Sequence, residues 1–131
     1  MIPRPVLYDA CVSGDRVGLL LKGVPMIVRT WRCWATIERA DEYAAYLTGT
    51  VFAGLQQIMG HREAQLLRRE DAGRVEFVAI SYWDTVAAIQ QYAGADISRA
   101  MVKPEARAML AGFDEIVNHY EMPYDTVGIA R

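Results

Sequence analysis

The sequence predicts an α+β domain in which a four-stranded antiparallel sheet carries helices on one face. Three observations lead to this fold class. Segments rich in β-branched and aromatic residues alternate with helical patterns in the order β, α, β, β, α, β, which is the ferredoxin-like arrangement. The chain has 131 residues, about the length of one domain. Its residues are 53% hydrophobic and 23% charged, which supports one buried core and excludes disorder as the main state.

The first strand and first helix are predicted between residues 27 and 59. Residues 27–35 (IVRTWRCWA) have the β-branched and aromatic content of a pleated surface. Residues 38–59 then place apolar side chains three or four positions apart, which aligns them along one helical face that ends near Gly60. These apolar residues are Tyr43, Leu47, Val51, Leu55 and Ile58.

A hairpin is predicted next. Residues 63–69 and 75–83 form two extended segments, and the short polar residues and glycine at 70–73 suit the turn between them. Alternation puts two apolar sets on opposite faces of the second strand: Phe77, Ala79 and Trp83 on one, and Val78, Ile80 and Tyr82 on the other. The domain's own helices can cover one face only, so we expect a homodimer formed through the open sheet face.

A second helix and a last strand complete the domain. Asp84 is suited to cap a helix that contains Val86 and Ile89 and ends at Gly94. Residues 96–110 suggest an irregular connection with a helical piece, in which Pro104 takes a first helical position and Gly112 lies near the end. Residues 115–124 have strand composition and contain Pro123, which stops the strand.

We therefore divide the chain into a domain at residues 26–124, an N-terminal arm or extension at residues 1–25, and a tail at residues 125–131. Residues 1–25 contain three of the five prolines and no sustained periodicity. They suggest an arm packed on a neighbouring subunit, an extra hairpin, or a product of an upstream translation start.

The charge balance and the cysteine count limit which partners the protein can bind and in which cellular compartment we expect it. The chain has 14 Lys and Arg against 16 Asp and Glu, a net charge of −2, so we expect neither nucleic acid nor a membrane as partner. The apolar stretch at residues 17–21 is too short for a spanning helix or a secretory signal. Two cysteines, Cys11 and Cys33, are too few for a disulfide framework. We expect a cytoplasmic protein.

Four stretches between residues 26 and 124 resemble the antibiotic biosynthesis monooxygenase-like group of dimeric α+β barrel proteins. They are residues 26–32 (MIVRTWR), 77–84 (FVAISYWD), 88–94 (AIQQYAG) and 119–121 (HYE). The resemblance, strongest to uncharacterised bacterial members, implies a homodimer whose two sheets form a barrel, with a ligand cavity between sheet and helices in each subunit. Members of the group oxidise aromatic polyketides without metal or prosthetic group, degrade haem, or have no known activity.

Haem degradation is disfavoured by three departures from the haem-degrading members. Those proteins use an asparagine on the first strand, a tryptophan in the second helix and a histidine about ten residues later. This chain has Arg29 and Arg32 but no asparagine on that strand, Tyr92 at the helix position, and Val102 ten residues further on. No residue there would ligate the iron. We therefore expect no cofactor.

His119 and Glu121 are the candidate acid–base pair, because residues two apart on a strand share a face. A histidine next to a carboxylate can take a proton from a phenol, which gives an electron-rich substrate for oxygen. The alternative is a structural hydrogen bond or an ion pair at the subunit interface. His61 and Glu63 have the same spacing, but two histidines without a thiolate cluster do not predict a metal site.

Large aromatic side chains and two arginines are the candidate ligand-binding residues. Flat aromatic walls suit a planar ligand, although a single ring on a strand or helix more often belongs to the core or the dimer interface. Arg29 and Arg32 point to opposite faces of the first strand, so only one faces the cavity, and alternation does not say which. The candidates are Arg29, Trp31, Arg32, Tyr82, Trp83 and Tyr92, with Trp34 as a further aromatic residue.

Two hypotheses of function follow from the sequence. The first is a homodimer that binds a small planar, largely apolar ligand and acts as a cofactor-independent monooxygenase of an aromatic substrate, with His119 as base and one arginine as oxyanion stabiliser. The second is a non-catalytic ligand-binding or interaction module with the same fold.

Overall fold

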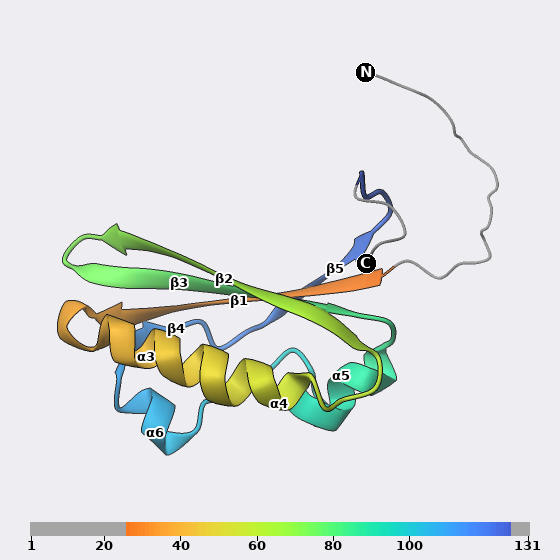
Figure 1. The fold of residues 1–131 in the computed structure, drawn as a ribbon, viewed down its shortest axis with the longest axis horizontal. Coiled ribbons are helices and arrows are strands. Elements are labelled where there is room, and N and C mark those ends of the chain that lie inside the picture. The colour runs from red at the N-terminus through yellow and green to blue at the C-terminus, as the bar shows by residue number, and fades with distance from the viewer. Residues whose placement is uncertain (1–25, 127–131) are drawn as a thin grey trace.

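The computed structural model describes residues 26–126, which form an antiparallel sheet with helices on one face (Figure 1). The strands are β1 (Met26–Thr36), β2 (His61–Asp71), β3 (Arg74–Trp83), β4 (Leu110–Phe113) and β5 (Asn118–Met122). The predicted arm or extension at residues 1–25 and most of the predicted tail lie outside the described residues. The α+β ferredoxin-like class predicted from the sequence is confirmed.

The sheet has the order β2-β3-β1-β4, and β5 also pairs with β1. The structure differs here from the single last strand expected at residues 115–124. β4 pairs with β1 at Cys33–Ala35, whereas β5 pairs with β1 at Met26–Thr30. Between them the chain leaves the sheet edge, because the Val117 amide donates to the Ser98 carbonyl at 2.7 Å. β4 and β5 together thus occupy the fourth position of the predicted sheet, and Gly112 lies in β4 rather than near a helix end.

The first helical layer is interrupted in its middle. It consists of η1 (Ile37–Arg39), α3 (Ala40–Tyr46), the π-helix η2 (Leu47–Phe52) and α4 (Ala53–Leu55). The Thr36 hydroxyl caps its start by accepting from the Arg39 amide. Thr48 donates its hydroxyl to the Ala44 carbonyl at 2.9 Å, a type of bond that competes with regular helix geometry. The helix expected at residues 38–59 is present, but it ends at Leu55.

Two shorter helices follow, α5 (Val86–Ala93) and α6 (Pro104–Arg107). α5 ends at Gly94, which has φ +85°, and Pro104 occupies the predicted first turn of α6. The capping residue of α5 is a correction: Thr85, not Asp84, accepts from the Ala88 amide. Asp84 is instead paired with Arg62 at 2.8 Å. No helix in residues 26–126 is long and apolar enough to cross a membrane.

The hairpin between β2 and β3 turns through Ala72 and Gly73, whose φ angles are +55° and +82°. Two consecutive left-handed residues form the turn that best matches the twist of antiparallel strands. The predicted hairpin is therefore confirmed, with both strands longer than expected.

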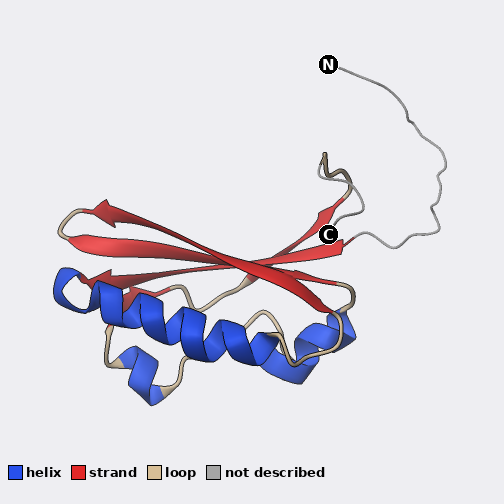
Figure 2. Cartoon of the chain, in the orientation of Figure 1, coloured by secondary structure: helices blue, strands red, loops and turns tan. Residues whose placement is uncertain are grey.

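All helices of the described chain lie on one face of the sheet, and the other face has no helix over it (Figure 2). Phe77 and Trp83 of β3 point toward the helices and are fully buried, in two clusters built around Tyr43 and Ile89. Their neighbours Val78, Ile80 and Tyr82 alternate onto the uncovered face and remain half-exposed. The predicted division of β3 into two apolar faces is present.

Candidate functional site

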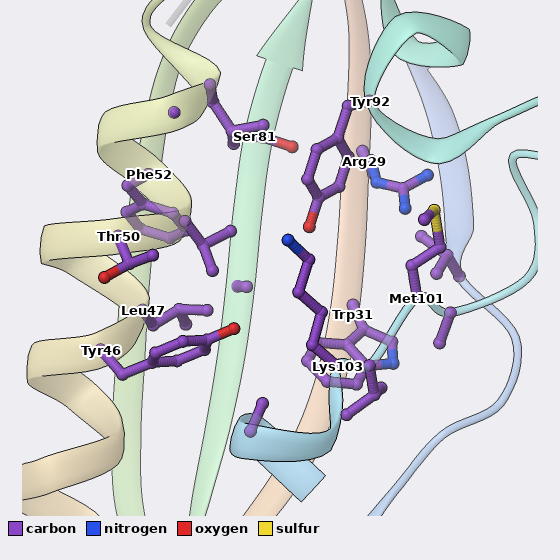
Figure 3. Close-up of a pocket in the computed structure, with 18 of the residues that line it drawn as sticks. Arg29, Trp31, Tyr46, Leu47, Thr50, Phe52, Ser81, Tyr92, Met101 and Lys103 are labelled. Atoms are coloured by element: carbon purple, nitrogen blue, oxygen red, sulfur yellow. The ribbon is translucent and has the colours of Figure 1, made fainter.

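A cavity of about 420 Å³ lies between the sheet and the first helical layer, and the segment from α5 to α6 closes its third side. This volume falls in the range of small-molecule sites, roughly 300–1,000 Å³. Its walls are mainly apolar and aromatic (Figure 3). The aromatic residues that line it are Trp31, Tyr43, Tyr46, Phe52 and Tyr92.

Trp31 forms part of the sheet wall and is held in place from two sides. Its Nε1 donates to the Asp114 carbonyl at 2.6 Å, and its ring packs against Phe113 with centroids 6.1 Å apart. Asp114 belongs to the bend between β4 and β5, so the interruption of the fourth strand supplies the acceptor that orients this indole. A ring fixed in this way presents a flat, rigid surface to the cavity.

The π-helix η2 forms much of the opposite wall. Leu47, Thr50, Val51 and Phe52 all line the cavity. A π-segment has wider turns than an α-helix and is often found at functional sites. The predicted apolar spacing indicated a helix here but gave no sign of the change in helical pitch.

Arg29 is the cavity's buried cation. It is 8% exposed, and its Nη1 donates to the Ile97 carbonyl at 2.8 Å. The same Nη1 lies 2.9 Å from Nε2 of His119, and the guanidinium carbon is 5.8 Å from the centroid of the Tyr92 ring. Burial lowers the pKa of Arg29, but guanidinium remains charged in proteins. The structure therefore shows which arginine of the first strand faces the cavity.

His119 lies directly opposite Arg29 in the pairing of β1 with β5. Because guanidinium can only donate, His119 Nε2 must accept, and the imidazole is neutral with its proton on Nδ1. Burial, and secondly the charge of Arg29, lower the pKa of His119. Among residues 26–126, no hydrogen bond joins His119 to Glu121, which is exposed, and neither residue lines the cavity. The predicted acid–base pair is thus not brought together.

Three other candidate residues lie away from the cavity. Arg32 points to the uncovered face, where it pairs with Asp114 at 3.2 Å. Tyr82 is on that face too, and its hydroxyl donates to Gln65 at 3.0 Å. Trp83 is fully buried in the core, where its Nε1 donates to the Ser81 hydroxyl at 2.8 Å.

Trp34 also lies on the uncovered face. Two guanidinium groups lie over its ring, with the Cζ atoms of Arg32 and Arg74 4.9 Å and 4.7 Å from the ring centroid. Both cations also lie on strands of the sheet, β1 and β3. Trp34 thus belongs to a charged aromatic cluster on the opposite side of the sheet from the cavity.

The polar residues of the cavity that the sequence did not single out are Tyr46, Thr50, Ser81, Gln91 and Lys103. Figure 3 shows the Lys103 side chain extending from the start of α6 across the cavity toward Tyr92. Tyr46 follows Tyr43 by three positions on the same helix, which is the one sequence signal that connects any of them to the site. The others come from segments whose spatial proximity depends on the tertiary fold.

The ionisable hydroxyls around the cavity stay protonated at neutral pH. Burial raises the pKa of Tyr92, although the charge of Arg29 partly opposes it, and burial likewise raises the pKa of Tyr43. The Cys33 thiol, 3.4 Å from the Tyr43 hydroxyl, has a pKa raised by burial to about 11. Tyr92 can therefore act as a hydrogen-bond donor, and Cys33 is not a nucleophile at pH 7.

The second histidine, His61, packs edge-on against Trp83 with centroids 4.9 Å apart. Its Nε2 is enclosed without a hydrogen-bond partner. Within the described range, no three His, Cys, Asp or Glu side chains are grouped as a metal site.

The fold and the cavity define a ferredoxin-like domain with a ligand-sized space beneath its sheet. Solved structures that share this fold include a cofactor-independent oxygenase, SnoaB, from Streptomyces nogalater, with a TM-score of 0.55 and 16% identity over 79% of this chain and 98% of that one. A candidate antibiotic biosynthesis monooxygenase from Bacillus cereus has a TM-score of 0.54 and 14% identity, covering 78% and 97% of the two chains.

A protein from Shewanella oneidensis aligns with a TM-score of 0.58 and 14% identity over 75% of this chain and 91% of that one. These similarities establish the fold of the antibiotic biosynthesis monooxygenases, as the resemblance noted in the sequence led us to expect. No family model and no curated protein sequence matches the chain.

Proposed function

We propose that this protein binds a small, planar, largely apolar ligand in the cavity beneath its sheet and oxidises it with dioxygen, without a cofactor. The aromatic cavity of about 420 Å³ carries the proposal. Trp31 and Phe52 face it from opposite sides, from the sheet and from the π-helix (Figure 3). Such a slot favours a flat aromatic molecule, because stacked or edge-on rings gain energy beyond simple burial.

Oxygenation is supported by the fold shared with the cofactor-independent oxygenase of Streptomyces nogalater. In a reaction without cofactor, the electrons come from the ligand itself. An activated methylene group plus dioxygen gives a carbonyl group plus water, with one oxygen atom in each product. The protein's part is to bind the ring system, to exclude bulk water and to stabilise the ionised ligand by hydrogen bonds, for which the Tyr92 hydroxyl and Arg29 are available.

We propose further that two copies pair through the uncovered sheet face. Leu67 and Tyr120 are 53% and 57% exposed on it, and half-exposed apolar side chains from the central strands adjoin them. The pairing register places all of them on the same face: Val28, Leu67, Val78, Ile80, Tyr82 and Tyr120. A set of exposed apolar side chains on one sheet face is typical of a subunit interface. The chain has only two cysteines, as is usual for proteins of a reducing compartment, so we propose that it is cytoplasmic.

A non-catalytic ligand-binding module is the second candidate function. It is favoured by one observation: no histidine, aspartate or glutamate of residues 26–126 lines the cavity. Proton abstraction from a bound ligand would then lack an adjacent general base. The two functions share the cavity and differ in whether the bound ligand consumes oxygen.

Native mass spectrometry of the purified protein, under gentle and then denaturing conditions, tests the binding and the assembly together. We expect a dimer that carries a planar small molecule released on denaturation. Oxygen uptake with that molecule as substrate then separates the two functions: uptake supports the oxygenase, and its absence supports the binding module. A monomer at micromolar concentration would contradict the proposed pairing.

A further inference from the structure

The charges that line the cavity are all of one sign. Arg29 and Lys103 are its cations, and no carboxylate of the described chain lines it. The whole protein has a net charge of −2, so this local excess of positive charge runs against the overall balance. A cleft lined by one sign of charge raises the local concentration of ligands of the opposite sign.

Arg29 combines burial with the lack of an acidic partner among residues 26–126. Five arginines have a carboxylate oxygen within 4.0 Å, and all five have substantially exposed side chains: Arg32, Arg39, Arg62, Arg68 and Arg69. Arg29 is 8% exposed, yet its hydrogen bonds go to a carbonyl and a neutral imidazole. A buried charge without a counter-ion is costly unless a ligand supplies one.

The hydrogen bonds of Arg29 leave one edge of its guanidinium unused. Both hydrogen bonds of Arg29 use Nη1, whereas Nε and Nη2 have no partner among residues 26–126. Neither of these nitrogens is fully enclosed, since the enclosed side-chain atoms without partners belong to Trp34 and His61. The Nε and Nη2 hydrogens point in parallel, which is the geometry that binds both oxygens of a carboxylate.

We propose that the ligand carries a carboxylate on its planar ring system and that Arg29 binds this group through its Nε and Nη2 edge. This inference rests on the proposed function, because it concerns the ligand of the same cavity. The Ile97 carbonyl and His119 fix the guanidinium through Nη1, which leaves the Nε and Nη2 edge available to a ligand without further ordering of the side chain. Lys103, on the opposite side of Tyr92 in Figure 3, adds a second positive charge.

A matched pair of probes tests this inference. 2-Naphthoate and 2-naphthamide have the same ring system and nearly the same shape, and only the first carries a charge. Their affinities for the full-length protein are measured by isothermal titration calorimetry at pH 7.5 and again in high salt. We expect naphthoate to bind at least about tenfold more tightly than naphthamide, as for a hydrogen-bonded charge pair.

Variants assign the preference to one side chain. Arg29→Met should reduce naphthoate affinity to that of naphthamide. Arg29→Lys, which keeps the charge but lacks the two-pronged edge, should retain part of the preference. Arg32→Met is the matched control on the opposite face of the same strand and should keep the full preference. Lys103→Met should lower naphthoate affinity less than Arg29→Met does, because Lys103 is exposed.

The outcomes separate this inference from the function beneath it. Equal binding of acid and amide by the wild-type protein, or a preference that survives in Arg29→Met, overturns the carboxylate assignment and leaves the ligand-binding cavity intact. Failure of both probes to bind overturns the two proposals together. The wild-type comparison needs no substitution, so it stands even if the Arg29→Met variant does not fold.

Discussion

Replacing Trp83 by phenylalanine tests whether this residue belongs to the core, as the structure indicates, or to the ligand-binding wall, as the sequence predicts. Trp83 is fully buried, and its Nε1 donates to the Ser81 hydroxyl at 2.8 Å. Trp83→Phe removes that bond and leaves a hydroxyl without its donor, which costs about 1–3 kcal/mol. The smaller ring leaves a void as well, although the total stays below the roughly 3–5 kcal/mol of a truncation to alanine.

We therefore expect Trp83→Phe to lower the free energy of unfolding by about 2–3 kcal/mol. Urea denaturation followed by circular dichroism, at one fixed protein concentration, measures it. The affinity for naphthoate should stay unchanged, because Trp83 does not line the cavity. Ser81→Ala serves as the control, because Ser81 and Trp83 are the two partners of one hydrogen bond. The double variant with Trp83→Phe and Ser81→Ala should therefore lose less unfolding free energy than the sum of the losses in the two single variants.

Two results would refute this reasoning. If Trp83→Phe were as stable as the wild type within about 0.5 kcal/mol, the indole would not be a packed and bonded core residue. If the variant kept its stability but lost naphthoate binding, the original assignment of Trp83 to the ligand wall would be the better one.

Three further predictions follow from the sheet and its histidines. The pKa of His119 and that of His61 are both lowered in the folded protein, chiefly by burial, so the unfolded chain takes up protons first as the pH falls below about 6.5. The free energy of unfolding should be highest above that pH and decline below it. In urea titrations, His119→Gln should lose less of this free energy between pH 7.5 and 5.5 than the wild type does. Equal losses would contradict the assignment of His119 as neutral in the folded protein. Tyr82→Ser, on the uncovered face, should weaken the dimer in sedimentation experiments, with exposed Glu121→Gln as the control; an unchanged dimer would place the interface elsewhere. His119→Ala should keep most of the rate of oxygen uptake with an accepted phenolic substrate, because His119 does not line the cavity. Loss of the activity in this variant would support His119 as the base.

The fold could be predicted from the sequence because each of its main elements has a local sequence pattern. The alternation in β3 and the three- and four-residue spacing of the first helix are periodic patterns, and Gly94 and Pro104 mark helix boundaries by their backbone preferences. The division of the last strand into β4 and β5 has no such signal. It depends on a long-range bond from the Val117 amide to Ser98, which no local pattern encodes.

The residues of the cavity could be predicted from the sequence only in part, because many of them come together through long-range contacts that leave no local pattern. Periodicity places Trp31 and Arg29 on one face of β1 and Arg32 on the other, but which face the helices cover is a property of the assembled layers. Tyr92, one of the candidate residues, lines the cavity. The π-helix and Lys103 were not predicted, because each depends on how distant segments approach one another.

The environment of Arg29 depends on which face of β1 the helices cover. The helices cover one face of β1 and remove Arg29 from water, while Arg32, three residues along the same strand, keeps its solvent and its carboxylate partners. The two arginines have the same chemistry, so the difference between them arises entirely from the side of the sheet on which each lies. Burial weakens the competition of water for the guanidinium and thereby strengthens any ligand bond that it makes. An arginine that is buried, oriented by a neutral histidine and left without a counter-ion is suited to binding an anion rather than to stabilising the fold.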